Sequence, residues 1–208
     1  MTGSLAPEAV APKLRGRFGK PYLYEQMCKS TQLLLLGSSL GEGAVAVTDE
    51  QTGGRGRLGR RWETPPGTAL LVSVLLHPPP ERHLPELSDG SVVIGIGINV
   101  DQSRDELPLD APTKAGSLRT VTGRSTDRAE LLVSLLFRLE RIYDGWRHGG
   151  LADLYGEIGA RDFLRGREIT VDGEPALALQ ILRDGRLEIE THAGAVRALE
   201  SGEIRYAA

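Results

Sequence analysis

Two near-continuous apolar runs constrain the fold of this chain more than any other feature. "TALLVSVLLH" covers residues 68–77, and "SVVIGIGINV" covers residues 91–100. Apolar runs of strand length are typical of strands that are buried on both faces. Three prolines, Pro78 to Pro80, end the first run, because proline cannot donate to a sheet. The two runs predict buried central strands, and together with the helix described below they indicate an α/β fold with a mixed sheet.

Composition and charge exclude several classes of protein. The formal net charge of −3 over 208 residues argues against general nucleic-acid binding. Cys28 is the single cysteine, which rules out a disulfide framework or a thiolate metal cluster. The four histidines are too scattered to predict a metal site, so we expect none. No apolar run is long enough to span a bilayer or to form a signal peptide. We therefore expect a cytoplasmic protein with no membrane partner.

The rest of the chain predicts a three-part organisation. Residues 1–21, rich in proline, alanine and glycine, are predicted to form a flexible N-terminal arm. The clearest helix follows Asp127, which can cap it, and ends at Gly149–Gly150. After Arg161, turn signals recur between short alternating runs, which is typical of a small β-barrel. The predicted boundaries are thus an arm over 1–21, a main domain over 22–160 and a barrel over 161–208.

The segment with the strongest chemical signal is a glycine–arginine loop, "GRGRLGRRW", residues 54–62. Four of its residues are arginines, Arg55, Arg57, Arg60 and Arg61. Arginine binds phosphate and carboxylate through two parallel charge-assisted hydrogen bonds, and glycine lets the backbone approach a ligand closely. The loop has neither the ending of a P-loop nor the spacing of a dinucleotide-binding loop. It predicts an anion site, with a solvated basic turn or an RNA-binding patch as alternatives.

Two other motifs are weaker. Gly95 and Gly97 lie two residues apart in the second apolar run, so they share one face of the predicted strand. That bare patch suits either a ligand or close packing against a helix. Gly37 to Gly41 matches Gly-x-Ser-x-Gly, the serine-hydrolase elbow, but the residues that follow predict a strand and not the required helix.

These motifs together resemble the biotin protein ligases. The loop at 54–62 is similar to that family's biotin-binding loop, Ser30–Thr31 to its early Ser-Thr-Asn motif, and "GIGINV" at 95–100 to a later signature strand. Gln32 stands where the family has asparagine. The resemblance covers about residues 22–206. It implies a catalytic domain of the type shared with class II aminoacyl-tRNA synthetases over 22–160 and an SH3-like barrel over 161–208.

The resemblance also implies an activity. Biotin protein ligases activate biotin with ATP and Mg²⁺ as biotinyl-5′-AMP, and then transfer it to a lysine of a biotin carboxyl carrier protein. Arg55 and Arg57 would be the catalytic residues, because they hold the carboxylate and the α-phosphate. By this resemblance, biotin would contact Ser30, Thr31, Gln51, Gly54, Arg55, Arg57, Gly95 and Gly97, and ATP would contact Arg57, Arg60, Trp62 and Asn99. The protein is expected to be a monomer or homodimer. It is not expected to bind DNA, since about twenty residues before the resemblance are too few for a winged helix.

One family segment has no counterpart. The family has Lys-Trp-Pro-Asn-Asp and a catalytic lysine between the two apolar runs, where this chain has only Pro79 to Ser91. The segment is either missing from this sequence, or the chain is a natural vestigial form that at most binds biotin. Loss of a strand and its helix exposes apolar surface, which favours the first explanation. A lipoate ligase is a further alternative, although that family lacks the arginine-rich loop.

Overall fold

The structure is a computed structural model that describes residues 3–56, 60–80, 90–109, 115–200, 202 and 204–206. The chain forms two compact units that divide at Arg141–Ile142. This division falls earlier than the boundary predicted at residue 161. The reason is that helix α4 (Arg128–Gly149) is continuous and runs from the first unit into the second.

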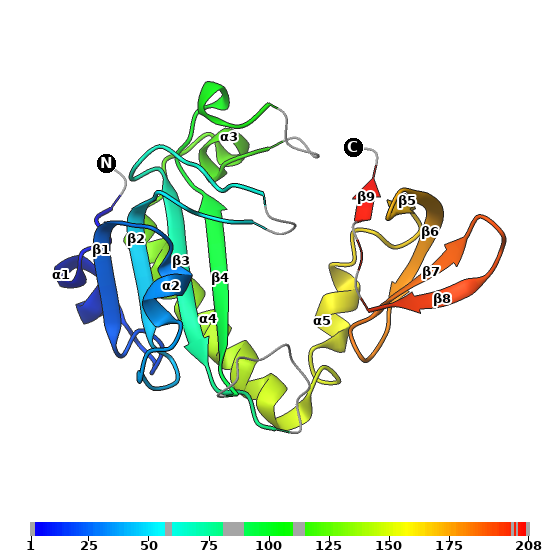
Figure 1. Ribbon diagram of the computed structural model, residues 1–208, viewed down its shortest axis with the longest axis horizontal. Helices are drawn as coiled ribbons and strands as arrows, with labels where there is room; N and C mark the ends of the chain where they lie inside the picture. Colours follow the sequence, from blue (N-terminus) through cyan, green and yellow to red (C-terminus); the bar gives the residue numbers. More distant parts are fainter. Residues whose placement is uncertain are drawn as a thin grey trace. The chain divides into compact units, whose positions relative to one another are not determined.

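The first unit is built on a four-stranded mixed sheet in the order β1-β2-β3-β4. Its strands are β1 (Tyr22–Cys28), β2 (Val45–Gln51), β3 (Ala69–Leu76) and β4 (Val92–Asn99). β1 and β2 are parallel, whereas β3 pairs antiparallel with both β2 and β4. Both apolar runs form strands, as predicted, and all eight residues of β3 are buried (Figure 1). The prediction of a buried central strand is wrong for β4, because β4 is the last strand of the sheet and none of its eight residues is buried.

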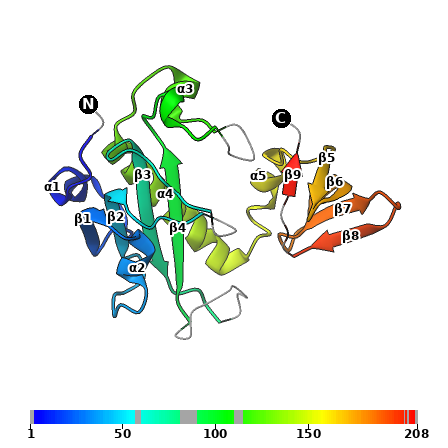
Figure 2. The same cartoon turned by 45° about the horizontal axis from the view of Figure 1, so that its top comes forward.

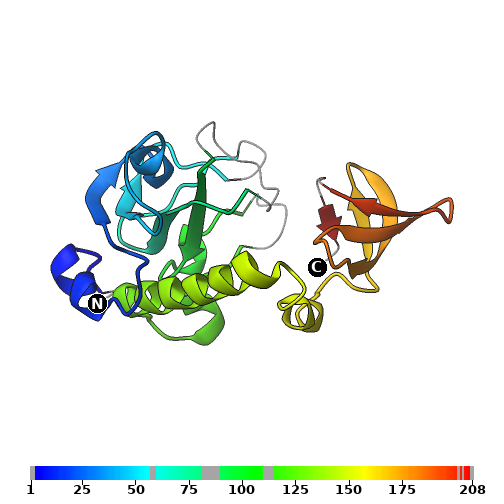
Figure 3. The same ribbon diagram turned by 90° about the horizontal axis from the view of Figure 1, so that it is seen from below.

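Helices cover both faces of this sheet. The short helix α2 (Thr31–Leu35) lies on one face, where Leu35 packs with Ala46 of β2 and Leu75 of β3. Alternation along β2 directs Val45 and Val47 to the opposite face, along which α4 runs (Figures 1 and 3). Burial on both faces explains why β3 carries a single polar residue, Ser73.

The N-terminal segment packs more closely than the predicted flexible arm. It contains helix α1 (Pro7–Val10) and the 3-10 helix η1 (Ala11–Lys13), and it buries the side chains of Leu5, Val10 and Phe18. The carboxylate of Glu140 on α4 accepts hydrogen bonds from the backbone N–H groups of Arg17 and Phe18. These three buried side chains are spread over fourteen residues, so no local periodicity in the sequence predicts their burial.

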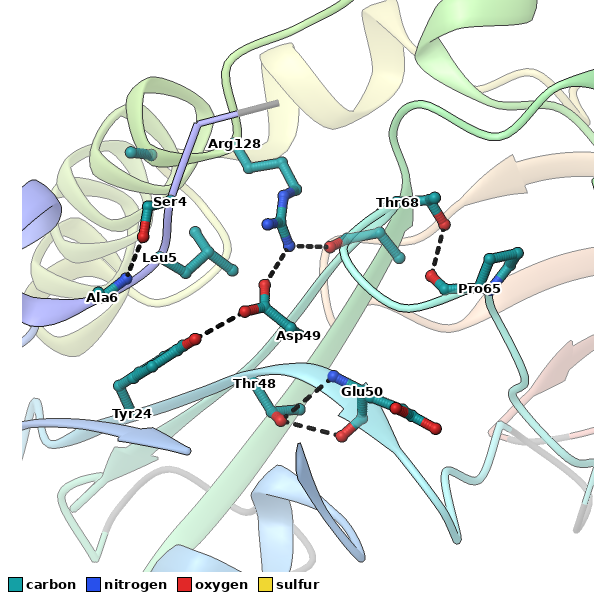
Figure 4. Close-up of polar contacts among 12 residues, drawn as sticks. Ser4, Leu5, Ala6, Tyr24, Thr48, Asp49, Glu50, Pro65, Thr68 and Arg128 are labelled. Carbon is teal, nitrogen blue, oxygen red and sulfur yellow. Dashed lines mark hydrogen bonds and ion pairs between the residues drawn. The ribbon is translucent and has the colours of Figure 1, made fainter. Parts of the chain in front are cut away.

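A polar cluster fixes the start of α4 to the sheet (Figure 4). Asp127 caps the helix, since its Oδ1 accepts from the N–H groups of Ala129 and Glu130. Next to it, Arg128 donates from Nη1 to Asp49 Oδ1 at 2.6 Å and to the Ala69 carbonyl oxygen at 3.2 Å. The other oxygen of Asp49 accepts from the Tyr24 hydroxyl at 2.6 Å. Arg128 thus connects α4 to β2 and β3, while Asp49 connects β2 to β1.

Between β4 and α4 the chain forms two short helices, η3 (Arg104–Glu106) and α3 (Leu118–Thr122). Ser117 caps α3, because its side chain accepts a hydrogen bond from the Thr120 N–H. No helix in the described part of the chain is long and apolar enough to cross a membrane.

The second unit contains helix α5 (Tyr155–Ala160) and a five-stranded antiparallel sheet in the order β8-β7-β6-β5-β9. Ile169, Val171, Ala178 and Ile189 form its core. Between residues 142 and 206, leaving out 201 and 203, β8 and β9 share no paired residues, so the sheet is open and the predicted barrel closure is not confirmed (Figure 2). The strands are β5 (Glu168–Val171), β6 (Glu174–Ile181), β7 (Leu187–Thr191), β8 (Val196–Leu199) and β9 (Ile204–Tyr206).

β3 and β4 pair along their whole length, from Ala69–Asn99 to Leu76–Val92. β4 is the last strand in the order, so its other edge has no strand partner among the described residues. The junction predicted at 79–91 lies mostly outside the described residues, which stop at 80 and resume at 90.

We expect Arg128→Met to lower the stability of the first unit. The Arg128 side chain is 5% exposed, and removal of one partner leaves the Asp49 carboxylate without its cation. Breaking a buried pair in this way costs about 3–5 kcal/mol. The check is urea unfolding, with Arg161→Met as the matched control, because Arg161 forms an exposed pair with Glu157. Equal unfolding midpoints for the two variants would contradict the role given to Arg128.

Tyr24 should make stability depend on alkaline pH. The hydrogen bond to Asp49, followed by burial, raises the pKa of Tyr24 from 10.0 to about 12. The folded protein therefore keeps a proton that the unfolded chain loses, so this contribution is complete below pH 10.0 and disappears as pH rises through about 12. In urea unfolding at a series of pH values, Tyr24→Phe should flatten the loss of stability over that window. An unchanged slope would show that another group titrates there.

Candidate functional site

The first unit contains a cavity of about 440 Å³ on the face of the sheet that carries α2. This volume is within the range of small-molecule sites. Four segments supply its walls: the start of α2, the glycine–arginine loop, β3 and β4. The lining residues are Ser30, Thr31, Gln32, Gln51, Arg55, Gly56, Trp62, Leu71, Val72, Ser73, Gly95, Ile96 and Gly97.

One end of the cavity is a fixed polar network. Gln51 Oε1 accepts from the Thr31 backbone N–H at 2.8 Å and from the Thr31 hydroxyl at 3.2 Å. The Thr31 hydroxyl is also 2.8 Å from the hydroxyl of Ser73, which is fully buried. Since Oε1 is used in this way, the Gln51 amide nitrogen is left as its remaining polar end. Ser30 begins α2 but makes no capping hydrogen bond with its side chain, so its hydroxyl also remains for other partners.

The glycine–arginine loop starts as a narrow antiparallel ribbon. The Trp62 N–H donates to the Gly54 carbonyl at 2.9 Å, and the Gly56 N–H donates to the Arg60 carbonyl at 2.8 Å. A side chain at position 54 would meet the Trp62 carbonyl oxygen at 2.6 Å and Gln51 Nε2 at 2.8 Å. Glycine is therefore required at 54 by close approach of the two strands of the ribbon to each other and to Gln51.

The loop's arginines differ in their surroundings. Arg55 is exposed and lines the cavity. Arg61 pairs with Glu63 at 2.7 Å, and both side chains are largely exposed. Arg60 is exposed and does not line the cavity within the described residues. Arg57 lies outside the described residues, so its predicted contacts with biotin and ATP stay predictions.

Gly95 and Gly97 make room for side chains of this protein. An added Cβ at Gly95 would lie 3.1 Å from Gln32 Nε2, and one at Gly97 would lie 2.9 Å from the Trp62 ring. Of the two alternatives for this bare patch, packing against a helix holds for Gly95, because Gln32 belongs to α2. At Gly97 the neighbour is the indole of the loop, and Trp62 Nε1 is buried with no partner among the described residues.

Asn99 is the one predicted residue of β4 that does not line the cavity. It shares a face with Gly95 and Gly97, since all three have odd positions in one strand. Its amide nitrogen donates to the Gly116 carbonyl at 3.1 Å, and its Oδ1 accepts from Gln102 Nε2 at 3.1 Å. The predicted residues Ser30, Thr31, Gln51, Arg55, Trp62, Gly95 and Gly97 meet in the cavity, and Gly54 lies directly beside Gln51.

Sequence reasoning missed two polar residues of the cavity as members of the site. Ser73 is the single polar side chain of β3, and a lone polar residue in an apolar strand could have indicated its place in the site. Gln32 was noted only as a departure from the family pattern, although it lines the cavity and covers Gly95. The serine-hydrolase alternative is not supported, because β2 follows Gly37–Gly41 and no helix does. Ser38 donates its hydroxyl to the Leu35 carbonyl.

Two other features compete less well for a functional role. The second unit has a larger cavity, about 580 Å³, lined by residues such as Glu168, Leu177 and Arg205. It lacks a buried polar network like that of Thr31, Gln51 and Ser73. Among the described residues, no three His, Cys, Asp or Glu side chains are close enough to one another to hold a metal ion.

Comparisons with known proteins agree with this geometry. Residues 24–99 match the profile of the biotin/lipoate A/B protein ligase family. The chain is 28% identical to the bifunctional ligase/repressor BirA of Bacillus spizizenii over 245 positions, which cover 89% of this chain and 74% of BirA. The biotin protein ligase of Aquifex aeolicus, solved with biotin and ATP, superimposes with a TM-score of 0.78 at 25% identity, over 89% of this chain and 98% of that one. The Helicobacter pylori enzyme shares the fold, with a TM-score of 0.53 at 18% identity, over 85% and 98%.

Residues 24–99 thus match the biotin/lipoate ligase family, and the chain as a whole is similar to biotin protein ligases in sequence and in fold. The BirA alignment also contains more positions than this chain fills. Since 89% of 208 residues is about 185, about 60 of the 245 aligned positions carry a residue in BirA alone.

The contacts at Gly95 and Gly97 predict different effects for two matched substitutions. In a Trp146→Phe background, Trp62 is the single tryptophan. Gly97→Ala should displace its ring and shift its fluorescence emission to longer wavelength, because the ring is rigid and its buried N–H becomes hydrated. Gly95→Ala should leave the emission unchanged, because the end of the Gln32 side chain can move aside. Equal shifts in the two variants would contradict this assignment of neighbours.

Proposed function

We propose that the chain binds biotin in the cavity of the first unit and joins it to AMP as biotinyl-5′-AMP, for transfer to a lysine of a biotin carboxyl carrier protein. The observation that carries the proposal is the composition of the cavity. A fixed polar network, an apolar floor and an exposed arginine line one space. Biotin has a matching order of groups: a ureido ring, an apolar thioether ring and chain, and a carboxylate.

The polar end would bind the ureido group. That group offers one carbonyl acceptor and two N–H donors. The Ser30 hydroxyl and the Gln51 amide nitrogen are the groups whose hydrogen bonds are not used within the network, so they are the direct contacts we propose. Thr31 would then act by holding Gln51, because its N–H and hydroxyl both contact Oε1. The Leu71 side chain, which shares a face with Ser73, would contact the thioether ring, and the backbone at Val72 and Ile96 would complete the floor.

The cationic end would bring together two anions. In the first step, a biotin carboxylate oxygen attacks the α-phosphorus of ATP, the bond to the β-phosphate breaks, and pyrophosphate leaves. Repulsion between carboxylate and phosphate opposes this attack unless cations screen it. Arg55 lines the cavity, and we propose that Arg57 joins it there as the second catalytic residue. Arg60 would contact the phosphates, whereas Arg61 is engaged with Glu63.

The nucleotide would extend from the cavity along β4. Trp62 would pack on the adenine, and Asn99 would contact the base. The described residues provide no acidic cluster, so we propose that Mg²⁺ enters bound to the phosphates of ATP. In the second step the lysine amine of the carrier attacks the biotinyl carbonyl carbon, AMP leaves, and the amine loses a proton. From the resemblance to biotin protein ligases, we also propose a cytoplasmic setting and an SH3-like second unit.

A second candidate function is biotin binding without ligation. The observation that favours it is that about 60 positions of the BirA alignment have no counterpart here. The family's catalytic lysine belongs to the segment that the sequence lacks between the apolar runs. No lysine lines the cavity within the described residues, although Lys29 packs against Gly53 beside it.

Arg55→Gln tests the cationic end, with Arg61→Gln as the matched control from the same loop. Calorimetric titration should give about ten- to a hundredfold weaker biotin binding for Arg55→Gln, since a charge-assisted hydrogen bond is worth about 1.5–3 kcal/mol. Arg61→Gln should bind as wild type does. With biotinamide, which has no carboxylate, the effect of Arg55→Gln should vanish. Loss of affinity for both ligands would show that Arg55 acts on the structure of the loop.

Ligation is tested with α-phosphate-labelled ATP, Mg²⁺ and biotin. We expect the present chain to bind biotin, and we expect biotinyl-5′-AMP to form once the BirA segment is inserted between Pro80 and Gly90. Adenylate formed by the present chain would show that the segment is dispensable. Lipoate should not compete with biotin, and competition would favour the lipoate branch of the family. Failure of both proteins to bind biotin would overturn the proposed function.

A further inference from the structure

Asn99, at the end of β4, has a side-chain amide that is held in one orientation. Its Nδ2 lies 3.1 Å from the Gly116 carbonyl oxygen, and its Oδ1 lies 3.1 Å from Gln102 Nε2. A carbonyl oxygen can only accept, so the nitrogen of Asn99 must face Gly116. Its oxygen must then face Gln102, which has to present its own nitrogen.

This arrangement leaves Gln102 with an unpaired acceptor. Gln102 is 1% exposed, and its Oε1 is buried with no hydrogen-bond partner among the described residues. Rotation of the Gln102 amide would place its Oε1 against Asn99 Oδ1, and the repulsion between two acceptors is less favourable than one unpaired acceptor. An unpaired buried acceptor is unfavourable for folding, so a purely structural position would be better filled by an apolar side chain of similar shape.

The network is anchored by tertiary contacts. The Ser117 hydroxyl donates to the Gln102 carbonyl at 2.6 Å, and Ser117 is itself buried as the cap of α3. A hydrogen bond from the Arg119 N–H to the carbonyl of Val100, the residue that follows β4, connects the backbone of α3 to the end of that strand. Gln102 therefore has a fixed backbone and a fixed side chain beside Asn99.

We propose that Gln102 is a positioning residue that fixes the Asn99 amide for adenine and against guanine. This inference rests on the proposed function, in which Asn99 contacts the base of ATP. After its two bonds, Asn99 keeps one N–H and one oxygen lone pair for a ligand. Adenine offers an amino donor beside a ring acceptor, which an amide of one orientation can match. Guanine carries an oxygen in place of that amino group, so the same orientation sets acceptor against acceptor.

Gln102→Leu is the first test, with Gln180→Leu as its matched control. Gln180 also donates from Nε2 to a side-chain oxygen, Glu188 Oε2 at 3.0 Å, but it lies in the second unit. Calorimetric titration of each protein with ATP, GTP and biotin gives three affinities. We expect wild type and Gln180→Leu to bind ATP at least about tenfold more tightly than GTP. Gln102→Leu should reduce that ratio about tenfold and leave the biotin affinity unchanged.

Thermal unfolding separates positioning from a structural role. Leucine removes the unpaired oxygen, so Gln102→Leu should keep or raise the melting temperature while it loses base selectivity. A lower melting temperature with an unchanged ATP-to-GTP ratio would overturn the proposal. In addition, Gln102→Glu should reduce the ratio further than Gln102→Leu, because a carboxylate beside Asn99 Oδ1 favours rotation of the Asn99 amide.

A double-mutant cycle tests whether Gln102 acts through Asn99. In an Asn99→Ala background, Gln102→Leu should change the ATP-to-GTP ratio by less than about twofold. A further drop in that background would overturn the proposal. Wild type that binds biotin without preferring ATP over GTP would overturn this inference alone. Wild type that binds neither biotin nor nucleotide would overturn the proposed function as well.

Discussion

The ion pair between Asp49 and Arg128 is the contact on which the first unit depends. It joins the start of α4 to the point where β2 leaves β3, and the same carboxylate accepts from Tyr24 of β1 (Figure 4). Two residues after Asp49, Gln51 forms the polar end of the cavity. A buried charge without its partner lowers the free energy of unfolding, so arrangements of α4, β1 and β2 that separate the pair are unfavourable. The position of Gln51 is thus set by a contact outside the cavity.

The cavity combines rigid and adaptable parts. Its polar end is a closed set of hydrogen bonds among Thr31, Gln51 and Ser73, which fixes their orientation before a ligand arrives. Its cationic end is a narrow ribbon that carries Arg55 into solvent. A fixed polar end and an exposed cationic loop suit a site that recognises one polar group by hydrogen bonds and binds anions through arginine. The two glycines of β4 contribute by admitting Gln32 and Trp62 to the walls.

The sheet of the first unit ends at β4, whose outer edge has no strand partner among the described residues. Exposed strand edges are normally covered, paired or protected by charge. Residues 91–100 contain no charged side chain, and β4 has no second strand partner among the described residues. The BirA positions without a counterpart in this chain, about 60, are numerous enough for further strands if they fall between β3 and β4 as the sequence motifs predict. Restoring it is therefore both a test of activity and a test of how this edge is covered.

The sequence by itself determined the elements whose signal is local. The apolar runs predicted the strands β3 and β4, Asp127 marked the start of α4, and the order of motifs indicated the resemblance to biotin protein ligases. Only the tertiary structure decided which residues meet. Ser73 and Arg128 lie far along the chain from Thr31 and Asp49. Gln102 is only three residues from Asn99, and its role comes from orientation and burial. Hydrogen bonds and ion pairs depend on distances of a few ångströms between such groups, and a linear pattern of residue types does not contain those distances.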